Sequence, residues 1–439
     1  MAKKKNKKRK PQPTPPMIRL SQCMIVKNEE KNIERALGWA KNIACEQIVV
    51  DTGSTDRTVE LAEKMGATVY HFKWIDDFSA AKNYAIEQAK GNWIAFLDAD
   101  EYFSPEDAKK LMSSLRQIQN NSSGSVFITA LVTPLVNLDD NNIPFAVHQQ
   151  CRIFRNHADI RYEGRIHENP TVGKDENIMY VPEFSIMHTG YSKAETDDKG
   201  KAFLKAKIIR EELEKNPNDP DHMVYLASAL AVPPSTAENL AEADKLNRAA
   251  LDKPELSMKL RQKAYNALLD DLIKKPELLD DFELYCKRAL KDFPGDLDFT
   301  YYYGALLSRR GKYQAALETL KECEEKIMST EDLSISYIVQ AQPAVLFLEI
   351  SCALQSLNDK ESTVQYLTIA LQLDKYKLSV LSKYISVMRE YGASDDELLS
   401  LLGQMYDYEN PGDQAFLLRA AGAAGDESLF DAIKSRILD

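Results

Sequence analysis

The chain has 439 residues, which is too long for one ordinary hydrophobic core and predicts two or three domains. Its formal net charge of -11 argues against nonspecific nucleic-acid binding by the whole protein, and no apolar run reaches the roughly 20 residues of a membrane helix. The six cysteines lack CxxC spacing, which fits reduced thiols and predicts a cytoplasmic protein.

The first segment, "MAKKKNKKRKPQPTPP", combines a lysine-rich stretch with prolines. This composition predicts a disordered, solubilising arm over residues 1–16. The alternative is weak attraction of the arm to an anionic membrane or polymer.

Short apolar segments alternate with helical patterns after the arm. We predict strands at 20–26, 46–51, 67–72 and 92–98, and helices at 29–42, 54–66 and 79–91. This order indicates βαβ units and therefore a parallel sheet with right-handed crossovers. The β-rich residues from 125 to 190 are expected to extend the same domain with antiparallel strands. The predicted fold class of residues 17–192 is α/β, with ligands bound at the carboxyl ends of the strands.

Residues 193–439 show helical patterns only. One segment places small and large residues at the offsets of a tetratricopeptide (TPR) repeat, namely Gly304, Leu307, Gly311, Tyr313, Ala316 and Leu320. A weaker copy lies at 345–374. We predict a TPR-like all-α domain with a concave surface that binds a partner or mediates oligomerisation, a homodimer included. The alternative is a helical bundle without repeats.

Carboxylates close the fourth predicted strand, in "NWIAFLDADEYF". The same spacing in "DPD" at 219–221 and "DLD" at 296–298 lies in polar loops before helices, where acidic residues are ordinary. Asp98 and Asp100 instead follow a strand expected to be buried, so their repulsion requires a compensating cation or hydrogen-bond donors. A Mg²⁺ or Mn²⁺ ion that carries substrate phosphates would meet this need. The alternative is a hydrogen-bonded acidic turn.

Three segments in chain order, "MIVKNEEKNIERAL", "QIVVDTGSTDRTVELAEKMGATV" and "FSAAKNYAIEQAKGNWIAFLDADE", resemble the family 2 glycosyltransferases of the GT-A fold. The resemblance implies that Asp51 reads the base or ribose of a nucleotide sugar, and that Asp98 contacts the ribose. It also places Asn28 and Glu29 against the nucleoside. Asp100 is the direct ligand that the resemblance implies for a divalent cation, Mn²⁺ or Mg²⁺.

The chain departs from the family pattern at two positions. Thr52 stands where many members have a second Asp, and Lys82 stands before Asn83 where many members have Arg. Lys82 and Asn83 are still expected to bind the nucleotide sugar, with the ammonium as a point charge for a phosphate. Arg155 is expected there too, although either it or Arg152 could equally brace the sheet.

The segment "YEGRIHENP" resembles the "G-x-(I/V)-H-E" stretch of family members that modify peptides and proteins. The resemblance implies that Glu168 is the general base and that His167 shapes the site, with Glu163 as the next candidate base. The alternative for Glu168 is a surface ion pair with Arg165. His188, in "SIMHTGY", is expected to complete the metal shell or contact the diphosphate, with a structural hydrogen bond as the alternative.

The resemblance extends to the sublancin-type peptide S-glycosyltransferases, in which a GT-A domain is fused to TPR-like helices. We therefore expect an inverting, metal-dependent hexosyltransferase that moves a sugar from a UDP-linked donor to a peptide or protein acceptor. The helical domain would bind that acceptor. One alternative is addition of sugar to a cell-envelope polysaccharide or lipid-linked glycan. The alternative of another class is a non-catalytic TPR scaffold, whose expected sign, a broken Asp-x-Asp, is not found in this sequence.

Overall fold

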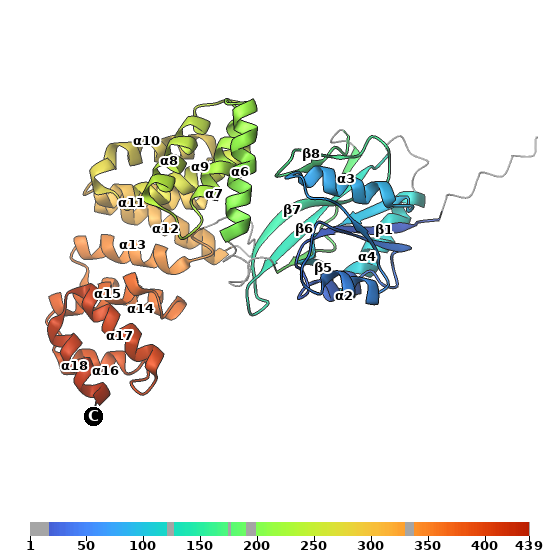
Figure 1. Ribbon diagram of the computed structural model, residues 1–439. Helices are drawn as coiled ribbons and strands as arrows, with labels where there is room; N and C mark the ends of the chain where they lie inside the picture. The colour runs from blue at the N-terminus through green and yellow to red at the C-terminus, as the bar shows by residue number, and fades with distance from the viewer. Residues whose placement is uncertain (1–16, 121–126, 174–176, 190–198, 330–337, 439) are drawn as a thin grey trace, which may run out of the picture. The chain divides into compact units, whose positions relative to one another are not determined.

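The computed structural model describes residues 17–120, 127–173, 177–189, 199–329 and 338–438. The chain divides into two compact units, Met1–Glu211 and Glu212–Asp439 (Figure 1). The predicted arm at 1–16 and the predicted boundary at 192/193 both lie outside the described residues.

The first unit is built on one mixed sheet. Its strands are β1 (Leu20–Val26), β2 (Glu46–Asp51), β3 (Thr68–His71), β4 (Trp93–Phe96), β5 (Glu101–Phe103), β6 (Ala130–Leu138), β7 (Pro144–Arg155), β10 (Ile178–Tyr180) and β11 (Ile186–His188). The order is β3-β2-β1-β4-β7-β6-β11-β5, with β10 beside β6. Strands β3, β2, β1 and β4 run parallel, and β7 then pairs antiparallel with both β4 and β6. The predicted parallel core with an antiparallel extension is thus confirmed.

Helices cover both faces of this sheet. They are α1 (Ile33–Gly38), α2 (Thr58–Lys64), α3 (Phe78–Gln88) and α4 (Pro105–Asn120). Successive side chains of β1 point to opposite faces of the sheet. Cys23 packs with Ile86 of α3 on one face, and Met24 packs with Leu37 of α1 on the other. In Figure 1, α3 lies on one side of the sheet and α2 and α4 on the other. A small hairpin, β8 (Tyr162–Glu163) with β9 (Asn169–Pro170), packs on the α3 side.

The parallel register brings three polar strand ends to one edge of the sheet. Val26 of β1 pairs with Asp51 of β2, and Cys23 pairs with Phe96 of β4, two residues before Asp98. The first predicted helix is shorter than expected, 33–38 instead of 29–42. Asn28 adopts a left-handed backbone with φ 58°, which turns the chain away from helix directly after the strand.

Helix α6 (Lys199–Lys215) contains the division between the units, and the second unit is all-helical in its described residues. Its elements are α7 (Pro220–Leu230), α8 (Ala237–Leu251), α9 (Met258–Leu272), the 3₁₀-helix η2 (Pro276–Leu278), α10 (Leu279–Asp292), α11 (Leu297–Arg309), α12 (Tyr313–Ser329), α13 (Pro343–Ser356), α14 (Lys360–Leu373), α15 (Leu378–Glu390), α16 (Asp395–Leu402), α17 (Pro411–Ala424) and α18 (Glu427–Leu438). Among the described residues no helix is both long and apolar enough to cross a membrane.

The two predicted repeats are helix pairs, α11 with α12 and α13 with α14. Their packing depends on a small residue at the crossing. A Cβ on Gly304 of α11 would lie 2.6 Å from Cδ2 and 2.7 Å from Cγ of Leu320, which is fully buried in α12. The glycine therefore allows the close approach of the two helices that the repeat pattern predicts.

We expect Gly304→Ala to lower the free energy of unfolding by about 1 kcal/mol, because overpacking outweighs the gain in helix propensity. The matched control is Gly422→Ala in α17, where a new Cβ would meet nothing within 4 Å. That change should raise the free energy of unfolding by up to about 1 kcal/mol. Urea unfolding followed by far-UV circular dichroism measures both. Equal stabilisation by the two alanines would contradict the packing argument.

Candidate active site

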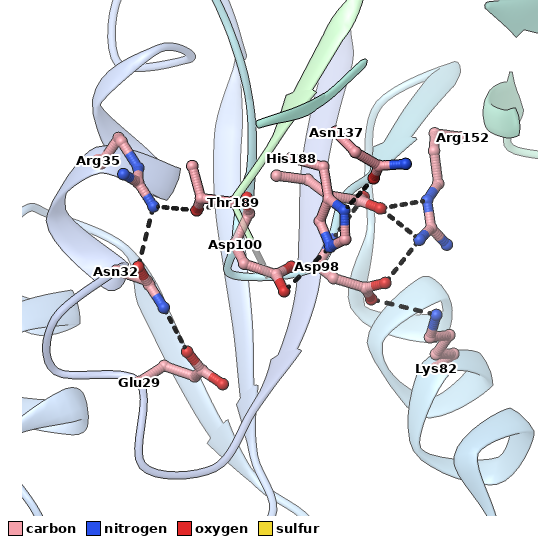
Figure 2. Close-up of polar contacts among 11 residues, drawn as sticks. Glu29, Asn32, Arg35, Lys82, Asp98, Asp100, Asn137, Arg152, His188 and Thr189 are labelled. Carbon is pink, nitrogen blue, oxygen red and sulfur yellow. Dashed lines mark hydrogen bonds and ion pairs between the residues drawn. The ribbon is translucent and has the colours of Figure 1, made fainter. Parts of the chain in front are cut away.

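Asp98 lies between two cationic side chains at the carboxyl end of β4. Its Oδ1 is 3.2 Å from Nζ of Lys82, and its Oδ2 is 2.6 Å from Nη2 of Arg152 (Figure 2). Partial burial favours the neutral acid, but Arg152 and Lys82 hold the pKa of Asp98 well below its usual range. Asp98 is therefore a carboxylate, and its side chain is still 37% exposed on the open side of the sheet.

Arg152 also binds the acid that follows the Asp-x-Asp tripeptide. Its Nη2 lies 2.5 Å and its Nε 3.2 Å from Oε1 of Glu101, whose side chain is only 2% exposed. Burial raises the pKa of Glu101, and Arg152 opposes that rise. The second carboxylate oxygen of Glu101 accepts the backbone N–H of Asp98 at 3.0 Å, which fixes the turn. Two of the three acids are thus held in place by one guanidinium.

A break in strand register directs Arg152 to this place. Leu131 of β6 pairs with Ile153, whereas the next residue, Val132, pairs with Cys151, so Arg152 is the extra residue of a β-bulge. Bulges re-aim single side chains and are common beside active sites. The bulge accounts for the position of the Arg152 side chain at the end of β4.

Asp100 contacts a different partner, His188 at the end of β11. Its Oδ2 lies 3.2 Å from Nε2 of His188, whose Nδ1 is 2.7 Å from Oδ1 of the buried Asn137 on β6 (Figure 2). Burial would lower the pKa of His188, but the hydrogen bond to Asp100 raises it. A carboxamide oxygen can only accept a hydrogen bond, so Nδ1 of His188 carries the proton that it donates to Asn137. In the neutral ring, the lone pair of Nε2 then faces the Asp100 carboxylate. That contact needs a proton or a metal ion between the two atoms.

Asp100 and His188 fit a divalent cation that takes its other ligands from substrate or water. They supply one oxygen and one nitrogen, and the ring is oriented from behind by Asn137, as metal-binding histidines usually are. Among the described residues, no group of three or more His, Cys, Asp or Glu side chains is placed to hold an ion. An incomplete protein shell of this kind is typical of Mg²⁺ and Mn²⁺ at phosphate groups.

A second polar cluster follows β1 and β2. Asp51 is 5% exposed and accepts the backbone N–H groups of Gly53 and Ser54 at 3.2 and 3.0 Å. Burial opposes ionisation, but these hydrogen bonds lower the pKa of Asp51. Asn28 joins the two strand ends, since its N–H donates to Ser54 Oγ and its Oδ1 accepts the N–H of Thr55. The cluster presents an ionised carboxylate at the sheet edge.

Glu29 belongs to a chain of hydrogen bonds that reaches Asp100. Its Oε2 accepts Nδ2 of Asn32, and Asn32 Oδ1 accepts Nη2 of Arg35, both at 2.9 Å. The same Nη2 of Arg35 donates to Thr189 Oγ1 at 2.6 Å (Figure 2). The backbone N–H of Thr189 donates to the Asp100 carbonyl at 3.1 Å. The ends of β1, β4 and β11 are thereby linked on one side of the sheet.

Glu168 lies on the other side, at the end of the β8–β9 turn. Its Oε1 is 2.7 Å from Nζ of Lys82, and its side chain is 14% exposed. Burial opposes protonation of Lys82, but Asp98 and Glu168 raise the pKa of this lysine far above its ordinary value. Lys82 is therefore a permanent cation with a carboxylate on each side. His167 precedes Glu168 in a left-handed conformation with φ 54° and is exposed.

Two residues that the sequence analysis placed at the nucleotide sugar, Asn83 and Arg155, contact other parts of the protein. Asn83 turns toward the backbone of Tyr162, donating to its carbonyl at 3.0 Å and accepting its N–H at 2.8 Å. Arg155 is not brought to the site, because it pairs with Trp93 at the opposite end of β4 from Asp98. Its Nε donates to the carbonyl of Ile128, and its guanidinium stacks on the Trp93 ring. Arg155 braces the sheet, which corrects its placement at the nucleotide sugar.

The sequence reasoning missed Glu101 and Asn137 and left Arg152 undecided. The sequence did contain a signal about Arg152 and Arg155. Residues three apart on a strand point to opposite faces, so the two arginines could not both serve one site. Glu101 was seen only as one more acid after the strand. Asn137 had no signal, since its role depends on β6 lying beside β11.

Comparison with known proteins connects this site to a family. Residues 21–162 match the family described as "Glycosyl transferase family 2". A TPR repeat-containing protein of Synechococcus elongatus is 33% identical over 226 residues, which are 49% of this chain and 52% of that protein. The SPbeta prophage-derived glycosyltransferase SunS of Bacillus subtilis strain 168 is 25% identical over 362 residues, which are 79% of this chain and 83% of SunS.

Among solved structures, S. aureus TarS 1-349 in complex with UDP is 15% identical, covers 72% of this chain and 93% of that chain, and has a TM-score of 0.31. The chain thus spans about half the length of its Synechococcus relative and most of SunS. The resemblance stated from the three sequence segments is confirmed by the family match. Residues 21–162 of this chain are a glycosyl transferase family 2 domain, set in a GT-A-like α/β fold and followed by a helical region.

Proposed function

We propose that this protein transfers a sugar, with inversion, from a UDP-linked donor to a peptide or protein acceptor. The observation that carries the proposal is the pairing of Asp100 with His188 beside the buried Lys82–Glu168 ion pair. One contact suits a cation on a diphosphate, and the other holds a carboxylate that can accept a proton. Both lie at the carboxyl edge of a family 2 sheet, where such domains bind their ligands.

The donor would lie along the strand ends. Asp51 and Asn28 would face the nucleoside, and the exposed part of the Asp98 carboxylate would accept a hydroxyl of the ribose. Asp100 and His188 would hold a Mn²⁺ or Mg²⁺ ion, which when bound neutralises negative charge on the leaving diphosphate. The protein contributes the fixed orientation of the His188 ring through Asn137.

Glu168 is the proposed general base. The acceptor hydroxyl or thiol gives its proton to the Glu168 carboxylate as the acceptor oxygen or sulfur bonds to the anomeric carbon. The bond from that carbon to the diphosphate oxygen breaks on the opposite face, and the nucleoside diphosphate leaves with the electron pair. Lys82 supports this role because its ammonium pairs with the carboxylate and holds its orientation before the acceptor arrives.

A polypeptide acceptor is supported by the helical half. The match to SunS runs over 362 residues, far beyond the family domain at 21–162, so the similarity includes helical sequence. Stacked TPR-like pairs such as α11–α12 and α13–α14 form surfaces suited to extended peptides. The "GRIHE" segment adds the resemblance to protein- and peptide-modifying members.

Asp100→Ala should remove the Mn²⁺-dependent part of UDP binding, weakening it by about 10-fold or more, because one of the two protein ligands is lost. Isothermal titration of UDP with and without Mn²⁺ measures this. The matched control is Asp221→Ala, which alters the same tripeptide spacing at a helix start in the second unit. Unchanged Mn²⁺ dependence in Asp100→Ala would exclude the assigned cation site.

Glu168→Gln should lower turnover by about 100-fold or more while UDP affinity stays nearly constant, because the amide cannot accept the proton. Release of UDP from the donor in the presence of acceptor reports turnover. Glu163→Gln is the control, since Glu163 lies in the same hairpin but is exposed. If the exposed residue proves to be the sensitive one, the base has been assigned to the wrong carboxylate.

The acceptor class requires a separate experiment. The protein should be incubated with Mn²⁺, a panel of UDP-sugars and peptides that carry Ser, Thr or Cys, and the products analysed by mass spectrometry. We expect a mass increase of one hexose-type unit on a peptide. Transfer to lipid-linked or polysaccharide acceptors, with none to peptides, would reject the polypeptide proposal and retain the glycosyltransferase.

A further inference from the structure

The start of α3 is bonded to the turn that carries Glu168. The hydroxyl of Ser79 donates to the carbonyl of Gly164 at 2.5 Å, and the N–H of Phe78 donates to the carbonyl of Arg165 at 2.9 Å. Both contacts join the segment "FSAAKN" to the hairpin formed by residues 162–170, hereafter the 162–170 hairpin. They lie in the family-like motif that the sequence assigned to the nucleotide sugar.

Asn83 extends this connection by one helical turn. Its carboxamide bonds both backbone groups of Tyr162, the carbonyl at 3.0 Å and the N–H at 2.8 Å. Two paired residues of neighbouring antiparallel strands form the same two hydrogen bonds, one from N–H and one to C=O. The Asn83 side chain therefore binds β8 as the backbone of an adjacent strand would. The oxygen and the nitrogen of the Asn83 carboxamide are both turned toward the backbone of Tyr162, so the hairpin sets the orientation of this side chain.

Lys82 completes the attachment from inside the domain. Its side chain is 2% exposed, and its ammonium lies 5.3 Å from the ring centre of Phe96 and 5.0 Å from that of Tyr162. Of its three N–H donors, two face carboxylates, Asp98 at 3.2 Å and Glu168 at 2.7 Å. A buried ammonium between two carboxylates and two rings is satisfied within the protein, whereas a phosphate-binding lysine needs access to its ligand.

We infer that Lys82 and Asn83 are positioning residues for Glu168 and do not contact the nucleotide sugar. Asn83 fixes the backbone of the 162–170 hairpin, and Lys82 fixes the carboxylate at its end. The inference rests on the proposed role of Glu168 as base. It gives the motif "FSAAKN" the role of holding the general base in place, instead of the role of binding the donor.

The first measurement is hydrogen exchange of the 162–170 hairpin, followed by mass spectrometry on the full chain. Lys82→Met and Asn83→Ala should each raise its exchange rate by about 10-fold, because the attachment to α3 is weakened. Peptides from β1 should exchange as before, which separates local loosening from unfolding. Lys90→Met, an exposed lysine just after the same helix, is the control and should leave the hairpin unchanged.

The second measurement separates a role toward Glu168 from a role toward the donor. For Lys82→Met, turnover should fall by about 10- to 100-fold at an unchanged donor KM. The Kd of UDP with Mn²⁺ should change less than about 3-fold, because Arg152 still holds the Asp98 carboxylate. Lys82→Arg should recover most of the turnover, because it restores a cation beside Glu168. In the Glu168→Gln background, Lys82→Met should have little further effect on turnover, since the two residues act as a unit.

Each result decides the inference. A UDP affinity lowered 10-fold or more in Lys82→Met or Asn83→Ala, with normal exchange in the hairpin, would return both residues to the nucleotide site. Failure of Lys82→Arg to differ from Lys82→Met would show that the positive charge is not what matters. If Glu168→Gln itself keeps full turnover, the proposed base is wrong, and the exchange data still report whether α3 holds the hairpin.

Discussion

The site depends on one continuous line of ion pairs. From one end to the other it runs Glu168, Lys82, Asp98, Arg152 and Glu101. Each cation bridges two carboxylates, so the loss of either would leave one end acid, Glu168 or Glu101, without its cation and Asp98 with a single one. Removing one partner of a buried ion pair typically costs about 3–5 kcal/mol. The line therefore sets the rotamers of three acids at once and joins the end of β4 to the 162–170 hairpin and the bulge of β7.

Asp100 does not belong to this line of ion pairs, and its side chain has a different kind of partner. Its partner His188 comes from β11, whose place beside β6 also brings Asn137 against the ring. Lys82 and Arg152 both form their ion pairs in the tripeptide with Asp98. The Asp100–His188 contact keeps a carboxylate oxygen and a ring nitrogen facing each other, an arrangement that favours a shared cation. Permanent cations stabilise one acid of the tripeptide while the other stays suited to an exchangeable ion.

Local sequence signals predicted the fold well where the structure is local. The alternation of strands and helices gave the parallel core, and the spacing of Gly304 and Leu320 predicted a helix pair whose packing depends on the glycine. The site was harder because its contacts join residues far apart in the sequence, 88 positions between Asp100 and His188 and 154 between Arg35 and Thr189. The choice between Arg152 and Arg155 depended on two features of strand pairing, the register that places Arg155 beside Trp93 and the bulge at Arg152. The pairing of Asn83 with Tyr162 likewise required knowing that the hairpin packs on α3.

The expected contact of Asp98 with the ribose remains compatible with its two ion pairs. Each carboxylate oxygen has two lone pairs, and Lys82 and Arg152 each occupy one direction at one oxygen. The side chain is 37% exposed, so a hydroxyl can approach and donate to a remaining lone pair. A charge fixed by two cations cannot swing toward the neighbouring ion site, and a donor hydroxyl would find it already oriented. The two aspartates thus differ in their surroundings, because Asp98 has two internal counter-ions and Asp100 faces His188.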